Sequence, residues 1–85
     1  MNICFIIGKI ISEVEFDFII NSKNISIIIF EIELEDKVKV RVKGYNEIAD
    51  YCYQQLKRND NISIQGLLNS NGEIEIQEIE KIEEV

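Results

Sequence analysis

Apolar and polar residues alternate over much of this chain, and short runs of turn-forming residues interrupt the alternation. From residue 14 to residue 20 every second side chain is apolar, and most of the intervening ones are acidic. Strict alternation predicts a strand with one buried face. Residues 2–10 are also strongly apolar, so we interpret residues 2–20 as one long strand. Gly8 is the expected position of a bend, because a glycine inside a strand often marks a bulge or a barrel corner.

The next two strands are predicted to form a hairpin. A turn at residues 21–24 precedes a strand at 25–34, and a second strand follows at 38–43. With Glu35-Asp36-Lys37 as a three-residue loop, apolar side chains face each other on the inner side. These inner pairs are Leu34 with Val38, Ile32 with Val40, and Phe30 with Val42. Opposite charges meet on the outer side, where the pairs are Glu33 with Lys39 and Glu31 with Arg41.

A helix is predicted at about residues 46–57, where apolar residues recur at spacings of three and four. Its apolar face would consist of Ile48, Ala49, Cys52 and Leu56. Asn46 can cap the first turn, and Asn59 can adopt the left-handed conformation that closes the last one.

Two more strands complete the pattern. One is predicted at residues 61–68, and the other begins at Glu73 after a turn at 69–72 that contains Asn-Gly. Beyond residue 76 the apolar spacing changes from two to three, which predicts a bulge, a bend or a final helical turn. The order of elements predicts a mainly β protein, a five-stranded Greek-key OB-fold barrel with one helix between strands 3 and 4. We expect residues 1–85 to form a single OB-fold domain.

Five segments resemble the bacterial single-stranded-DNA-binding protein family, in the order in which that family has them. They are Asn2–Ile10, Phe30–Ile32, Tyr45–Asp50, Leu56–Asp60 and Ile64–Leu68. The resemblance implies an OB-fold that binds single-stranded DNA, pairs its barrels through strand one into a homodimer or homotetramer, and works with replication proteins. The chain departs from the family in having no tryptophan, and in having turns where the family has long loops between strands two and three and between strands four and five. It therefore resembles a trimmed core barrel.

The candidate nucleic-acid site lies on the strand at 38–43 and its continuation. Basic and aromatic residues occupy odd positions there and so can share the face that binds oligonucleotides in OB-folds. By the resemblance, Tyr45 is the base-stacking residue and Lys9 adds a phosphate contact. The predicted nucleic-acid-binding residues are Lys9, Lys39, Arg41, Lys43 and Tyr45.

The same basic residues have a structural interpretation. Glu31 and Glu33 would pair with Arg41 and Lys39 across the hairpin, and such exposed pairs contribute about 0.2–1 kcal/mol. The two interpretations stay open for Lys39 and Arg41. Lys43 and Tyr45 lie beyond these acidic partners along the strand, so we favour a functional role for both. Tyr45 could still be a packing residue at the entry to the helix.

Charge limits the possible partners. Sixteen acidic residues against nine basic ones give a formal net charge of −7, which opposes binding to a polyanion. A second hypothesis is therefore an OB-fold module for protein interaction or assembly that has lost DNA binding. A third is an acidic mimic of DNA.

The sequence offers little catalytic chemistry. It contains no histidine, no glycine-rich phosphate loop, no metal-ligand motif and no nucleophile motif. We expect a protein that is not an enzyme and has no cofactor. Cys4 and Cys52 are too few for a secreted disulfide framework and are expected to be small buried hydrophobes. No leader pattern and no apolar run of about 20 residues is present, so we expect a cytoplasmic protein that does not contact membranes.

Overall fold

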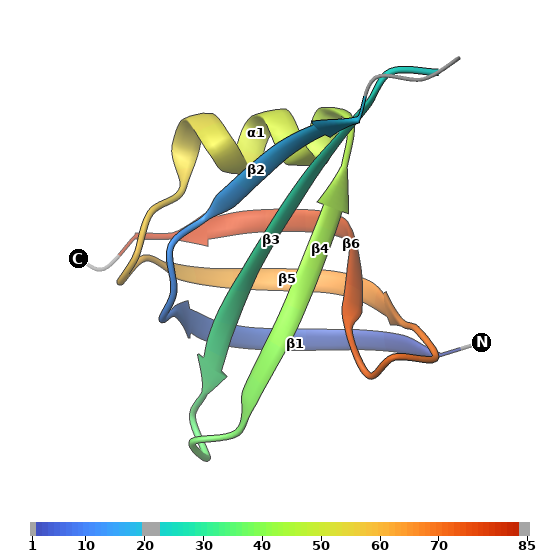
Figure 1. The fold of residues 1–85 in the computed structure, drawn as a ribbon. Helices are drawn as coiled ribbons and strands as arrows, with labels where there is room; N and C mark the ends of the chain where they lie inside the picture. The colour runs from blue at the N-terminus through green and yellow to red at the C-terminus, as the bar shows by residue number, and fades with distance from the viewer. Residues whose placement is uncertain (1, 20–22, 84–85) are drawn as a thin grey trace.

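The strands of this protein close into a barrel (Figure 1). The computed structural model describes residues 2–19 and 23–83. Its elements are β1 (Ile3–Ile10), β2 (Glu15–Ile19), β3 (Ile25–Leu34), β4 (Lys39–Tyr45), α1 (Glu47–Gln55), β5 (Asn61–Leu68) and β6 (Ile74–Ile82). Neighbouring strands follow the order β1-β5-β6-β4-β3-β2, and β1 also pairs with β3. This last pairing joins β1, β5, β6, β4 and β3 into a ring.

Two pairings close the ring. β4 and β6 run parallel, with Val42 opposite Ile74. β1 and β3 run antiparallel where Gly8 lies opposite Leu34. A Cβ atom on Gly8 would lie 2.7 Å from the carbonyl oxygen of Glu33, so the crossing of these two strands requires a glycine. With α1 inserted between β4 and β5, this is the predicted OB-fold, and the fold class is confirmed.

The prediction of one continuous first strand is wrong. The chain leaves β1 after Ile10 and resumes as β2 at Glu15, so the interruption lies at residues 11–14 and not at Gly8. At the interruption, the backbone N–H of Glu31 on β3 donates a hydrogen bond of 2.8 Å to the Ser12 hydroxyl. The Ile11 N–H donates to the carbonyl oxygen of Glu31 at 2.9 Å. The Ser12 hydroxyl thus takes the place of the backbone carbonyl that would accept this N–H in a continuous strand. On either side of the interruption, β1 and β2 pair with opposite ends of β3.

The predicted hairpin is confirmed in its register. Phe30 lies opposite Val42, and the outer pairs are the predicted ones. The Lys37 N–H donates to the Leu34 carbonyl oxygen at 2.9 Å, and Lys37 has a left-handed φ of 71°, which closes the three-residue loop. β4 extends two residues beyond the predicted end, to Tyr45. The predicted turn at 21–24 lies partly outside the described residues.

The helix is shorter than predicted, but its buried face is correct. Ala49, Cys52 and Leu56 are buried, and Ile48 packs partly against the core. The capping prediction for Asn46 is wrong, because its side chain makes no capping hydrogen bond and its φ is 54°. Asn59 has the predicted left-handed conformation, with φ of 79°, but it does not close the helix, because α1 ends at Gln55 and its C-cap is Leu56.

The core fills the barrel, and α1 covers one end of it (Figure 1). The fully buried side chains of largest volume are Phe30, Ile10, Ile28, Ile32, Ile62, Val42 and Cys52. The last strand contains a bulge, which was one of the predicted alternatives. Gln65 pairs with Glu78 and Gly66 with Ile76, so Gln77 has no opposite residue on β5. In the described part of the chain, no helix is long and apolar enough to span a bilayer.

Candidate nucleic-acid interface

The outer face of β4 carries the predicted basic residues. Burial alternates along the strand, with Val42 and Gly44 facing the core and the odd-numbered residues facing outward. The predicted residues of β4 therefore share one face, and these are Lys39, Arg41, Lys43 and Tyr45.

Barrel closure brings Lys9 to the same face. On β3, Glu33 pairs with Lys9 of β1 on one side and with Lys39 of β4 on the other. Side chains of directly opposed residues lie on the same face of a sheet, and two strand spacings separate the two lysine Cα atoms by about 10 Å. We call this line of three residues the Lys9–Lys39 row. Both lysines are exposed.

The expected ion-pair ladder forms only in part. Arg41 Nη2 lies 3.8 Å from Glu31 Oε1, as predicted, and both side chains are largely exposed. Glu33, however, pairs with Lys37 of the hairpin loop, at 3.9 Å, and not with Lys39. Among residues 2–19 and 23–83, neither Lys9 nor Lys39 has an ion pair within 4.0 Å. The row therefore holds two cations available to a ligand.

Lys43, by contrast, has a close acidic partner that the sequence analysis missed. Its Nζ lies 3.0 Å from Glu73 Oε1, in the turn between β5 and β6. Lys43 does lie beyond Glu31 and Glu33 along the strand, as expected, but it is not free of an acidic partner. The partner comes from thirty residues downstream, and only the parallel pairing of β4 with β6 brings it near. The order of OB-fold strands contained the signal, because closure requires this pairing.

Several contacts hold the Glu73 carboxylate in place. Asn69 Nδ2 donates to Glu73 Oε1 at 3.3 Å, and the Asn69 side-chain oxygen accepts the Glu73 backbone N–H at 3.0 Å. The residue is 8% exposed. Hydrogen bonds from Lys43 and then Asn69 favour the charged form and hold the pKa of Glu73 below its ordinary value of 4.5.

Tyr45 lies next to an apolar stretch of β3. It pairs with Ile27, and Lys43 pairs with Ile29. Both isoleucines are partly exposed on the outer face. This face thus has a basic end near Lys39 and an apolar end near Tyr45. The ring of Tyr45 is 38% exposed, which leaves surface for a base to stack on.

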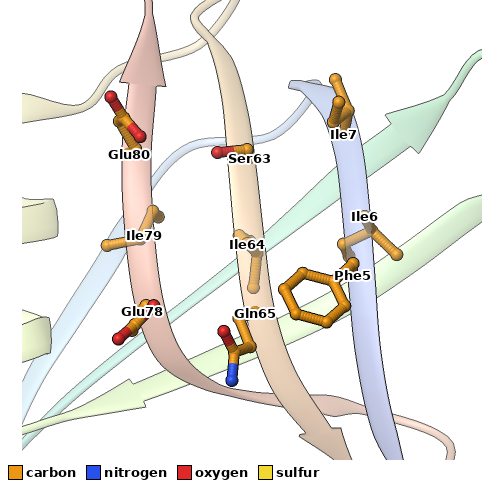
Figure 2. Close-up of a pocket in the computed structure, with 9 residues that line it drawn as sticks. All are labelled: Phe5, Ile6, Ile7, Ser63, Ile64, Gln65, Glu78, Ile79 and Glu80. Carbon is orange, nitrogen blue, oxygen red and sulfur yellow. The ribbon is translucent and has the colours of Figure 1, made fainter.

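A second surface lies along β1 (Figure 2). Phe5 and Ile7 are 77% and 66% exposed, and they border a pocket of about 530 Å³. Ser63 and Gln65 of β5 form its floor, and carboxylates of β6 lie on the far side. Within the described residues, the segment from residue 3 to residue 7 pairs with β5 alone, so its other edge is open.

Solved structures with similar folds were found. The SSB domain of a Synechococcus protein has a TM-score of 0.78 and 15% identity over 93% of each chain. The second OB-fold domain of replication protein A from Methanococcus maripaludis has a TM-score of 0.76 and 19% identity, over 95% of this chain and 84% of that one. The chain has the OB fold.

A third OB-fold neighbour is longer than this chain. The single-stranded DNA binding protein from Thermus aquaticus has a TM-score of 0.80 and 15% identity, and the match covers all of this chain and 42% of that protein. No protein-family model and no curated protein matches the sequence. The likeness at these identities concerns the barrel and not the individual side chains of its surface.

The remaining chemistry of this OB-fold chain is sparse. Burial raises the pKa of the Cys52 thiol to about 12, so it is protonated at neutral pH and is a poor nucleophile. Cys4 is partly buried. No group of three or more metal-ligating side chains occurs among the residues that the structure describes.

Proposed function

We propose that this chain is a single-stranded nucleic-acid-binding module that assists DNA replication or recombination in the cytoplasm, by binding and not by catalysis. One observation carries the proposal, namely the Lys9–Lys39 row with its two cations free of ion pairs in the described structure. The likeness of the barrel to single-stranded DNA-binding domains supports it.

The predicted residues have unequal roles in this proposal. Lys9 and Lys39 contact phosphates, and Tyr45 stacks on a base. Arg41 contributes less, because Glu31 lies 3.8 Å away, although such an exposed pair is weak enough to exchange its carboxylate for a phosphate. Two or three phosphate contacts give weak binding. The logarithm of the association constant should fall with the logarithm of the salt concentration, with a slope of about −1.4 to −2.1.

A titration of fluorescent oligo-dT between low and physiological salt tests the proposal. The variants are K9Q, K39Q and the double variant, and K57Q is the matched control. Lys57 is exposed, lies on the loop after α1, and has no ion pair in the described structure. We expect the double variant to reduce the salt slope by about 1.4, because two phosphate contacts are lost, while K57Q leaves it near the wild-type value. Absence of binding at high micromolar protein, or equal effects of K57Q and the double variant, contradicts the proposal.

Tyr45→Ala tests the stacking role separately. Loss of one base–aromatic stack costs about 1–3 kcal/mol, which weakens binding at least fivefold without changing the salt slope. An unchanged affinity would remove Tyr45 from the site.

We also propose that the barrel forms at least a homodimer through β1. The open edge between residues 3 and 7 and the exposed rings and methyl groups of Phe5 and Ile7 support this assembly. Light scattering of the wild type and of Phe5→Asp tests it. We expect a dimer or tetramer for the wild type and a monomer for the variant, and a monomeric wild type refutes the proposal.

A protein-interaction module without DNA binding is the second candidate function. The pairing of Lys43 with Glu73 and the net charge of −7 favour it, because both reduce the attraction of this face for a polyanion. It predicts no binding of oligo-dT even at the lowest salt, together with recovery of a specific protein partner by cross-linking. Salt-dependent binding that requires Lys9 and Lys39 excludes it.

A further inference from the structure

Lys43 differs from Arg41 of β4 and from Lys37 of the hairpin loop in how closely its acidic partner lies. Its partner Glu73 lies at 3.0 Å, whereas the pairs of Arg41 and Lys37 measure 3.8 and 3.9 Å. The side chains of Lys43 and Glu73 are 25% and 11% exposed, so water screens their attraction less than it screens the other two pairs.

The turn between β5 and β6 holds Glu73 in position for this contact. The Asn69 side-chain oxygen accepts the backbone N–H groups of Asn71 and Glu73, at 2.9 and 3.0 Å. Gly72 adopts a left-handed φ of 77°, and its N–H donates to the Asn69 carbonyl oxygen. The carboxylate therefore does not have to be ordered when it meets Lys43, which lowers the entropic cost of the pair.

A carboxylate and a phosphate oxygen are alternative acceptors for the same ammonium group. Lys43 lies on the outer face of β4, two residues from Arg41 and two from Tyr45. A nucleic-acid strand that continues from the Lys9–Lys39 row towards Tyr45 must therefore pass Lys43, where Glu73 already fills the position of a phosphate.

We propose that Glu73 competes with nucleic-acid phosphate for Lys43 and thereby limits the affinity of this face. This inference rests on the proposed nucleic-acid binding and identifies Glu73 as a residue that limits it. The strand is held through the Lys9–Lys39 row, and the contact at Lys43 forms only when Glu73 is displaced or neutralised.

The test is the oligo-dT titration with E73Q, K43Q and the double variant K43Q/E73Q. Two controls carry the same change of charge away from this contact. E78Q removes a carboxylate from β6, and K81Q removes a lysine whose partner is Asp60 at 3.6 Å. Circular dichroism verifies that each variant is folded.

We expect E73Q to bind about fivefold more tightly than E78Q at low salt, and to steepen the salt slope by about 0.7, since one phosphate contact is gained. The gain should disappear in K43Q/E73Q. K43Q/E73Q should bind about as tightly as the wild type, because Lys43 contributes no contact while Glu73 occupies it and the double variant removes both charges of the pair together. This last comparison tests the inference even if E73Q fails to fold.

Three results would overturn the inference. They are equal affinities of E73Q and E78Q, a gain that persists in K43Q/E73Q, and a loss in K43Q/E73Q as large as that in K39Q. If the wild type binds through Lys9 and Lys39 but E73Q adds nothing, the inference alone fails. If neither the wild type nor E73Q binds, the proposed function fails with it. Binding by E73Q alone contradicts the proposed function, because the Lys9–Lys39 row would then not hold a strand in the wild type.

Discussion

Gly66→Ala should destabilise the barrel strongly, because the added methyl group would clash with the backbone of β6. Gly66 lies on β5 at the bulge, opposite Ile76, next to the segment of β6 (Ile74 and Glu75) that pairs with β5 on one side and with β4 on the other. A Cβ atom there would lie 2.5 Å from the Glu75 carbonyl oxygen and 2.6 Å from Ile74 Cγ2, inside the 3.0 Å that real Cβ atoms keep. The backbone of β6 would have to move by about 0.5 Å or more to relieve the contact.

The expected magnitude follows from the nature of the clash. Insertion of a methyl group into a packed core costs about 1–3 kcal/mol. Here the nearest atom is a backbone oxygen, which cannot move without shifting the hydrogen-bonded strand, so we expect a cost of about 3 kcal/mol. Gly72→Ala is the matched control. Its Cβ would meet nothing within 4 Å, but its φ of 77° is left-handed, so only the conformational cost of about 1–2 kcal/mol applies.

Thermal unfolding and urea titration, both followed by far-UV circular dichroism, measure the two free energies. For a domain of this size, 1 kcal/mol lowers the melting temperature by about 4–8 °C, so Gly66→Ala should lower it by about 12–24 °C. A smaller loss of stability for Gly66→Ala than for Gly72→Ala would refute the reasoning. It would mean that the backbone of β6 can move away from a Cβ atom on β5 at little cost in free energy. Because Ile74 and Glu75 pair with both β5 and β4, a shift of this segment in Gly66→Ala should also weaken the contact between Lys43 and Glu73.

The other predictions concern single side chains. Burial raises the pKa of Cys52 to about 12, so a thiol reagent at pH 8 should label Cys4 in the native protein and reach Cys52 only after unfolding. Because the pKa of Glu73 is lowered in the folded protein, its charge stabilises the fold above its unfolded pKa of about 4.5, and this stabilisation is lost as pH falls through the folded pKa. The unfolding free energy of E73Q should therefore vary less with pH in this range than that of the wild type. Asn59→Ala should lower stability by about 1 kcal/mol in urea titrations because φ is 79° there, whereas Asn59→Gly should not.

Local patterns predicted most of the secondary structure because strand alternation and helical spacing involve only residues that are close in sequence. The hairpin of β3 and β4 follows from alternation and from a three-residue loop, and its register was correct at every pair between Phe30 and Lys39. The buried face of α1 follows from spacing in the same way. The change of spacing after Ile76 located the bulge, although it did not distinguish a bulge from a bend.

The errors arose where a distant segment supplies the partner. No glycine, proline or other turn signal marks residues 11–14, but the Ser12 hydroxyl accepts a hydrogen bond from the Glu31 N–H there and the strand is interrupted. Asn46 is a favourable capping residue by type, yet its φ of 54° places its side chain where it makes no capping hydrogen bond. Propensity and periodicity cannot anticipate such contacts, because they come from the packing of other elements.

By itself, the sequence determined the position of the helix between the hairpin and the last two strands, the inward side chains and the basic character of β4, since each depends on residue type and spacing. Only the tertiary structure decided which of those basic residues keep their charge available. Closure of the barrel aligns Lys9 with Lys39 on either side of Glu33, and the parallel pairing of β4 with β6 sets Glu73 against Lys43. Electrostatic attraction acts over distances in space, and the folded barrel alone sets those distances.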